Sequence, residues 1–182
     1  MPNAIGILEL SSIAAGIQAL DAMLKRAQVQ VIEARMTCIG KYLAIITGDV
    51  AAVTSAVETG KAAGGKHVLE ADVIANIADG VLESIHGIMD KSEIKALGIL
   101  ETKTLAMGFL GADAIRKAAN VRLLKLHVSL GLGGKAVVLF TGDVASVENA
   151  LRVGVEKIGN PDKIKEAIAI PSPDQGLIDS LK

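Results

Sequence analysis

Aromatic residues and cysteine are scarce in this chain of 182 residues, which has no Trp, one Tyr, two Phe and one Cys. The chain therefore has few aromatic rings on which single-stranded nucleic acid would stack. A net charge of −1 without a Lys/Arg cluster gives no electrostatic footprint for a duplex. One cysteine cannot form a disulfide within the chain, which is typical of proteins in a reducing cytoplasm. We therefore expect a cytoplasmic protein that does not bind nucleic acid.

Long hydrophobic runs are also missing. Stretches such as Ala136–Phe140 end far short of the ~20 residues that span a bilayer. The first residues carry Glu9 and no basic residue, so we expect neither a membrane segment nor a secretory signal. Yet 51% of the residues are hydrophobic and the mean hydropathy is +0.46. Surface of this composition is usually covered by other subunits, which predicts an oligomer.

The sequence is an internal repeat. AIGILEL at residues 4–10 returns as ALGILET at 96–102, and TGDV at 47–50 returns at 141–144. Asp21 and Lys25 are likewise echoed by Asp113 and Lys117. Two copies of one small domain predict a pseudo-symmetric building block. We place the first domain at residues 3–86, a linker at 87–94 and the second domain at 95–182.

Each copy has the pattern strand, helix, strand, strand, helix, strand. This pattern predicts an α+β fold in which a sheet containing antiparallel strands has helices on one face. Ser12 is a suitable helix N-cap, and so are Asp49 and Asp143 in the second helix of each copy. In the first copy we expect strands at 4–10, 29–37, 42–47 and around 67–69, with Ile13, Ile17, Leu20 and Leu24 on one helical face. The second copy ends with a strand around 164–170.

Several blocks of the second copy resemble the bacterial microcompartment shell domain, and the resemblance covers almost the whole chain in both copies. They are Ala96–Thr102, Gly111–Ala114, Lys117–Val121 and Gly142–Val144. Two such domains in one chain are similar to the tandem-domain shell proteins. The lone cysteine in the turn Thr37–Lys41 is similar to that of a tandem shell protein of propanediol-utilisation compartments.

The resemblance implies a flat, pseudohexameric homotrimer that tiles into a shell in the cytoplasm, with other shell proteins and encapsulated redox enzymes as partners. It implies that Cys38 of three chains binds one [4Fe–4S] cluster on the three-fold axis, where Lys41 is placed to offset thiolate charge. Lys25 and Lys117 would lie at tile edges. The pore would be lined by the turns of both copies, at Thr37, Ile39, Gly40, Leu130, Gly131, Leu132, Gly133 and Gly134.

One motif of the family is altered. An Ile-Pro-Arg-Pro motif often follows its last strand, with the Arg at the tile edge. Here the second copy has Ser172 in that place, within Ile170–Pro173, and the first copy reads Ile74–Ile77 without an Arg. This difference affects the lateral contacts between tiles.

Other candidate sites have simpler interpretations. His67, His86 and His127 lack a second ligand at metal-binding spacing, and the glycine-rich turn at 131–134 lacks the Lys-Ser/Thr of a phosphate loop. Glu9 and Glu101 occupy equivalent positions, and we expect them to satisfy backbone or neighbouring-chain donors. We expect a protein that is not an enzyme.

Three functions remain open. The first is a shell tile that carries electrons through a [4Fe–4S] cluster. The second is a metal-free tile whose central pore passes small polar metabolites. The third, of another class, is a regulator that binds a small molecule at subunit clefts.

Overall fold

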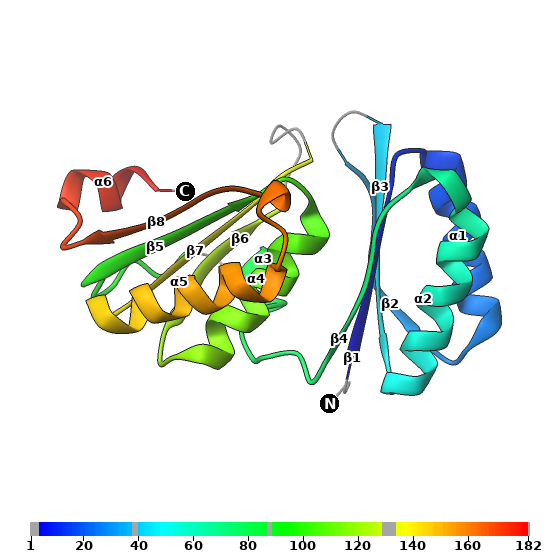
Figure 1. Ribbon diagram of the computed structural model, residues 1–182, viewed down its shortest axis with the longest axis horizontal. Helices are drawn as coiled ribbons and strands as arrows, with labels where there is room; N and C mark the ends of the chain where they lie inside the picture. The colour runs from blue at the N-terminus through cyan, green and yellow to red at the C-terminus, as the bar shows by residue number, and fades with distance from the viewer. Residues whose placement is uncertain (1–3, 38–39, 87–88, 129–133, 182) are drawn as a thin grey trace. The chain divides into compact units, whose positions relative to one another are not determined.

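The computed structural model describes residues 4–37, 40–86, 89–128 and 134–181. The chain forms two compact units. The first contains the described residues up to Ile77, together with Thr104–Ala106 and Gly134. The second contains the remainder, from Ala78 onwards. Figure 1 shows the elements of each unit.

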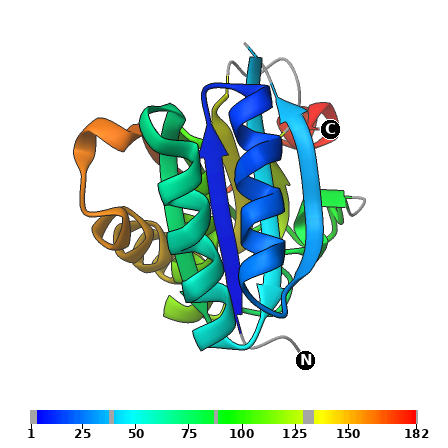
Figure 2. The same ribbon diagram turned by 90° about the vertical axis from the view of Figure 1, so that its right-hand side faces the viewer.

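The first unit is a four-stranded sheet with two helices on one face (Figure 2). Its strands are antiparallel and follow the order β2-β3-β1-β4. The strands are β1 (Ala4–Leu10), β2 (Gln30–Thr37), β3 (Lys41–Gly48) and β4 (Val68–Ala75), and the helices are α1 (Ile13–Arg26) and α2 (Val50–Gly64), followed by the short 3-10 turn η2 (Gly65–His67).

The second sheet repeats this topology in the order β6-β7-β5-β8, again with antiparallel pairs. The predicted α+β fold with two copies of one unit is confirmed. The strands are β5 (Ala96–Thr102), β6 (Arg122–His127), β7 (Ala136–Gly142) and β8 (Ile164–Pro171), and the other elements are α3 (Glu83–His86), α4 (Leu105–Ala118), α5 (Val144–Ile158), η3 (Pro161–Lys163) and α6 (Gln175–Ser180).

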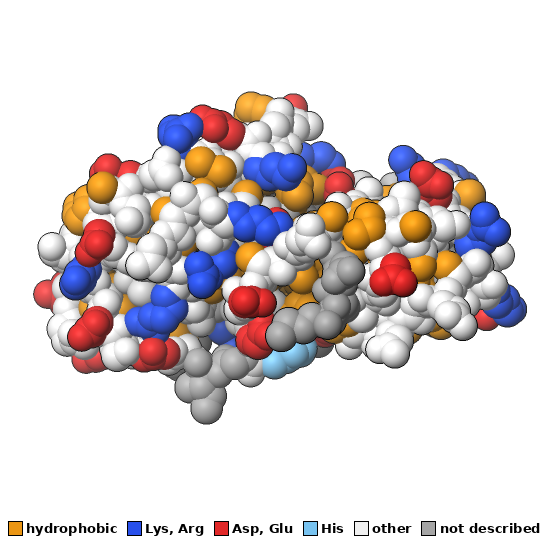
Figure 3. Space-filling view, turned by 90° about the horizontal axis from the view of Figure 1, so that it is seen from below, with side chains coloured by type: hydrophobic (Ala, Val, Ile, Leu, Met, Phe, Trp, Pro, Cys, Tyr) orange, Lys and Arg blue, Asp and Glu red, His pale blue; other side chains and the backbone are white. Residues whose placement is uncertain are grey.

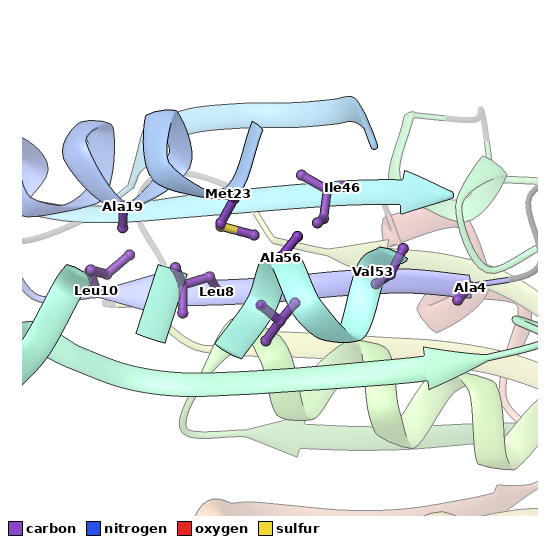
Figure 4. Packing of buried hydrophobic residues seen from close by; sticks show 9 residues of the cluster. Ala4, Leu8, Leu10, Ala19, Met23, Ile46, Val53 and Ala56 are labelled. Carbon is purple, nitrogen blue, oxygen red and sulfur yellow. The ribbon is translucent and has the colours of Figure 1, made fainter. Parts of the chain in front are cut away.

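Small side chains bring the helices of the first unit close to the sheet. Alternate residues of β1 face α1 and α2, and Leu8 and Leu10 pack there with Met23 and Val53 (Figure 4). A Cβ at Gly16 would lie 2.5 Å from the ring and Cβ of Tyr42, so α1 rests directly on β3. The scarcity of aromatic residues is therefore matched by close packing of glycine and alanine.

The predicted apolar face of α1 is not its buried face. Ile17 is 56% exposed and Leu24 is 42% exposed, whereas Gly16, Ala19 and Met23 are buried. Small residues form much of the buried face because they allow the closest approach to the sheet. Apolar side chains consequently remain on the outer face of this helix.

Two local predictions need adjustment. The last strand of the first copy begins at Val68 and runs to Ala75, because η2 takes up the residues before it. Asp49 and Asp143 stand at helix N-cap positions without a side-chain capping bond, and Asp143 faces Lys95 at 3.6 Å. Ser12 does cap α1, since its side chain accepts a hydrogen bond from Ala15 N–H at 3.4 Å.

Charged side chains of both signs are interspersed on the face shown in Figure 3. Over the described ranges, every helix is too short or too polar to cross a bilayer.

Candidate functional site

The turn between β2 and β3 holds the predicted cluster ligand. Cys38 and Ile39 lie outside the described residues, so their predicted roles stay predictions. On one side of them, Thr37 is 6% exposed, and its Oγ1 has no hydrogen-bond partner among the described residues. On the other side, Gly40 has φ +70°, and a Cβ there would meet nothing within 4 Å. The turn therefore needs glycine at position 40 for its backbone conformation and has open space beside it.

The turn of the second copy ends beside the first turn. Leu130, Gly131, Leu132 and Gly133 are outside the described residues, whereas Gly134 has φ +78°. A Cβ at Gly134 would lie 2.6 Å from Lys41 Nζ, and both residues belong to the first unit. The structure thus brings together the ends of two turns that are far apart in sequence. The family resemblance implied that both turns line one pore, and that role stays a prediction.

A buried ion pair lies beneath these turn ends. Lys41 Nζ donates to Glu9 Oε1 at 3.1 Å, and Leu105 N–H donates to Glu9 Oε2 at 2.8 Å. The Glu9 side chain is fully buried. Burial raises the pKa of Glu9, although Lys41 and the backbone N–H groups of Leu105 and Ala106 act in the opposite direction. The prediction that Glu9 satisfies backbone donors is confirmed, and Lys41 has a carboxylate partner of its own.

The second copy repeats the ion pair in a more open setting. Lys135 Nζ lies 3.1 Å from Glu101 Oε1, the same distance as in the first copy. The Glu101 side chain is 29% exposed and that of Lys135 is 39% exposed. The two carboxylates thus have the same lysine contact and differ in what covers them.

Both copies thus share one strand–turn–strand unit with a paired Glu and Lys. Comparison with known families matches the BMC domain twice, at residues 4–77 and 96–173. The chain belongs to the BMC-domain family. Together the two matched segments span most of the sequence, so the chain is a tandem BMC-domain protein.

Relatives with the same two-domain length support this assignment. The chain is 40% identical to the bacterial microcompartment shell protein PduT of Citrobacter freundii over 177 residues, which cover 97% of this chain and 96% of PduT. It is also similar to a solved microcompartment protein of Desulfitobacterium hafniense, with 42% identity, a TM-score of 0.82, and coverage of 96% and 97% of the two chains. The resemblance to tandem shell proteins of the PduT kind is confirmed.

A more distant structure shares the fold. The fused permuted hexameric shell protein MSM0275 has a TM-score of 0.66 at 17% identity and covers 85% of this chain and 83% of its own. This likeness is evidence for the fold alone.

The predicted tile-edge lysines occupy matching places in the two BMC domains. Lys25 Nζ pairs with Asp21 at 2.6 Å, and Lys117 Nζ pairs with Asp113 at 2.8 Å. Lys25 is 75% exposed, whereas Lys117 is 42% exposed beside a buried Asp113. Asp113 also accepts a hydrogen bond from Ala78 N–H at 2.8 Å. Both lysines are therefore held by an i,i+4 carboxylate near a helix C-terminus.

The two residues at the place of the missing edge arginine share one backbone feature. Asn76 and Ser172, which follow β4 and β8, both have positive φ, at 50° and 48°. Ser172 N–H donates to Lys95 O at 2.9 Å. Each copy thus has a residue with positive φ directly after its last strand, a backbone conformation that is uncommon for residues other than glycine.

The second unit has an open polar cavity of about 650 Å³. Its lining includes Arg116, Arg122, Lys95, Asp79 and Asp143. Arg122 pairs with Asp90 at 2.6 Å and donates to the Ser92 carbonyl. Cations and carboxylates are mixed in this lining, so it favours neither an anionic nor a cationic ligand. In the described part of the chain, no group of three or more His, Cys, Asp and Glu side chains is placed to hold a metal ion.

Proposed function

We propose that this protein is a shell tile of a bacterial microcompartment in the cytoplasm, and that three chains close into a ring of six BMC domains. The main support is the full-length similarity to PduT, which has the same two-domain length. The repeat supplies the geometry, because a chain with two BMC domains makes up one third of a ring of six. Contacts that repeat from chain to chain close into a ring.

The electron-transfer function is the finer part of the proposal. Cys38, one from each of three chains, would hold a single [4Fe–4S] cluster at the ring axis. Thiolate is the ligand that such clusters require, and one cysteine per chain is too few without three-fold convergence. When bound, the cluster supplies one-electron transfer across the shell. This would help to regenerate redox centres of enzymes enclosed by the tiles.

The residues around Cys38 are compatible with this assignment. Gly40 has positive φ with open space at its Cβ position, so nothing described on this side of the turn fills the room that a cluster needs. Thr37 presents a buried hydroxyl that has no partner among the described residues. Such a hydroxyl is a hydrogen-bond donor for a nearby thiolate or sulfide.

The chain's own residues have two tasks in this proposal. Gly40 keeps the turn in a conformation that other residues rarely adopt, which lets backbone approach the axis. Lys41 holds the turn end to Glu9 through its ion pair, and this fixes the start of β3. Because Glu9 already balances the charge of Lys41, Lys41 anchors the end of the turn and does not act as a free cation beside the cluster.

The test is iron and acid-labile sulfide per assembled particle, with EPR spectra before and after dithionite, on protein prepared without oxygen. We expect about four irons and four sulfides per three chains, as for a [4Fe–4S] centre. In Cys38→Ser both should be lost while the native mass is unchanged. Thr37→Val is the matched control, because it removes only the neighbouring hydroxyl and should retain iron.

Two outcomes would contradict parts of the proposal. Stoichiometric iron in Cys38→Ser would remove Cys38 as the ligand. An assembled wild-type particle that takes up no iron would leave a tile with a metal-free pore for polar metabolites, with Gly134 and Gly40 at the turn ends. Electron micrographs at high protein concentration separate either tile from a regulator, since tiles form sheets or tubes.

A further inference from the structure

We propose that the open polar cavity of the second unit binds a small zwitterion of the amino-acid type. Arg116 would bind the carboxylate of this molecule, and Asp79 and Glu93 would bind its amine. Every residue that lines the cavity belongs to the second unit. The site therefore lies within one unit of one chain and needs neither the ring nor the cluster proposed above.

The size of the cavity suits a small molecule. Its volume is about 650 Å³. Pockets for small molecules usually have volumes of about 300–1,000 Å³ and hold a few polar groups that orient the ligand. The cavity thus has room for a molecule of amino-acid size together with water that bridges it to the lining.

Arg122 builds one wall of the cavity by fixing the segment that precedes β5. Its guanidinium pairs with the Asp90 carboxylate at 2.6 Å and donates to the Asp90 carbonyl at 2.8 Å and to the Ser92 carbonyl. The Asp90 carboxylate also accepts a hydrogen bond from Ser92 N–H at 2.9 Å. Because both terminal nitrogens of Arg122 are engaged in this way, Arg122 shapes the cavity and leaves ligand binding to other groups.

The remaining charges of the lining are one cation and two carboxylates. Lys95 and Asp143 lie 3.6 Å apart and balance each other. Arg116, Asp79 and Glu93 make no hydrogen bond or ion pair through their side chains with other described residues. Groups of both signs are therefore available to a ligand in the same cavity.

These three side chains match the two ends of an amino acid. Arg116 is half-buried in the last turn of α4. A guanidinium binds a carboxylate through two parallel hydrogen bonds, and partial burial strengthens such a pair relative to one in water. Carboxylates such as those of Asp79 and Glu93 accept hydrogen bonds from an ammonium group. A ligand with a single charge would satisfy only one of the two sets, whereas a zwitterion satisfies both.

The first copy of the repeat lacks the two arginines. Arg116 corresponds to Leu24, and Arg122 corresponds to Gln30, each 92 positions earlier in the sequence. The strand pairing places Arg122 and Gln30 at the same register of their sheets. Both copies form the same sheet and helices, so the fold does not require cations at these positions. A role for them in the second copy must come from something other than folding.

Glu93 has an unusual backbone conformation. Its φ is +50°, in a region that is uncommon for residues other than glycine. Arg122 holds the carbonyl of Ser92, the residue directly before it. Strained residues of this kind persist where surrounding contacts hold them, and they cluster at binding sites. The wall built by Arg122 thus positions a carboxylate in the lining.

The experiment is saturation-transfer difference NMR on the full chain with defined probes. The probes are glycine, γ-aminobutyrate and 6-aminohexanoate, in which the amine and the carboxylate are increasingly far apart. Butyrate and butylamine carry only one of the two charges. We expect saturable binding of at least one amino acid, about tenfold or more tighter than that of butyrate or butylamine, because one charge-assisted contact is lost in each.

Variants assign the two ends of the ligand. Arg116→Leu introduces the residue of the first copy and should weaken amino-acid binding about tenfold or more, whereas Arg116→Lys keeps the charge and should have a smaller effect. Asp79→Asn combined with Glu93→Gln should lower amino-acid affinity to that of butyrate. Arg26→Leu, in the last turn of α1, is the matched control and should bind as the wild type does. Far-UV circular dichroism checks that each variant is folded.

The outcomes separate this inference from the proposed function. Cys38→Ser should bind the probes as the wild type does, so a failed cluster assignment leaves the cavity site intact. A wild type that binds none of the three amino acids saturably would overturn the site. Butyrate that binds as tightly as the amino acids would overturn the zwitterion class, and unchanged affinity in Arg116→Leu would overturn the role of Arg116.

Discussion

Replacing Gly98 with alanine tests the packing of the second sheet. Gly98 lies on β5, and a Cβ built there would be 2.2 Å from Phe140 Cζ and 2.5 Å from both Cε atoms of that ring. Non-bonded carbon atoms normally lie about 3.5–4.0 Å apart. The ring or the strand must therefore move by more than 1 Å, by roughly the difference between these distances. Phe140 is fully buried, so its ring has no open side to move into.

The expected cost is at the upper end of that for overpacked cores. Inserting a methyl group into a well-packed site costs about 1–3 kcal/mol, and we expect about 3 kcal/mol here because the obstacle is a rigid ring. For a chain of this length, each kcal/mol lowers the melting temperature by about 2–4 °C, so Gly98→Ala should melt about 6–12 °C below wild type. Gly60→Ala is a milder comparison, since its Cβ would meet Met23, a flexible side chain.

The assay is urea and thermal unfolding followed by circular dichroism at fixed protein concentration, because the chain has no Trp and one Tyr. A second substitution, Phe140→Leu, removes the ring and should recover part of the loss. The double variant should then be more stable than the sum of the single changes predicts. Gly98→Ala with wild-type stability, or with no coupling to Phe140→Leu, would refute the packing argument.

Three further predictions concern charge and hydrogen bonding. Burial raises the pKa of Glu9, so the folded protein binds the carboxyl proton of Glu9 more tightly than the unfolded chain does. The free energy of unfolding of the wild type should therefore fall as the pH rises from the ordinary carboxyl pKa through the raised pKa. Urea unfolding of Glu9→Gln should lack this slope, and parallel pH profiles would contradict the assignment. Thr141→Val should cost about 1–3 kcal/mol, because the Thr141 hydroxyl donates to the buried Ala96 carbonyl at 2.7 Å. Equal urea midpoints for this variant and the wild type would be evidence against it. If Lys25 and Lys117 make contacts at the tile edge, replacing both with alanine should abolish sheets in electron micrographs. The native mass of the particle should not change. Sheets as abundant as those of the wild type would show that the two lysines have no role at the edge.

Much of the fold was predictable because the repeat shows each strand and helix pattern twice in the sequence. The strand at 4–10 was predicted with its observed bounds, because its short apolar run is bounded by Ser11 and Ser12. The repeat places the equivalent strand at 96–102, where β5 lies. The side of α1 that packs inward was not predictable from hydrophobicity alone. Ile17 and Gly16 are neighbours in sequence, and only close contact with Tyr42 shows that the glycine faces the sheet.

Some features of the candidate site follow from the sequence, and others only from the tertiary structure. The sequence alone determined that the chain contains two BMC domains, that a single cysteine lies in the first turn, and that Glu9 and Glu101 are equivalent, because these are properties of residue order. Only the tertiary structure decided that Lys41 lies against both Glu9 and Gly134, and that Glu9 is buried while Glu101 is partly exposed. The physical reason is that solvent exposure and contact depend on neighbours far apart in the chain. Two identical motifs can therefore end in different surroundings.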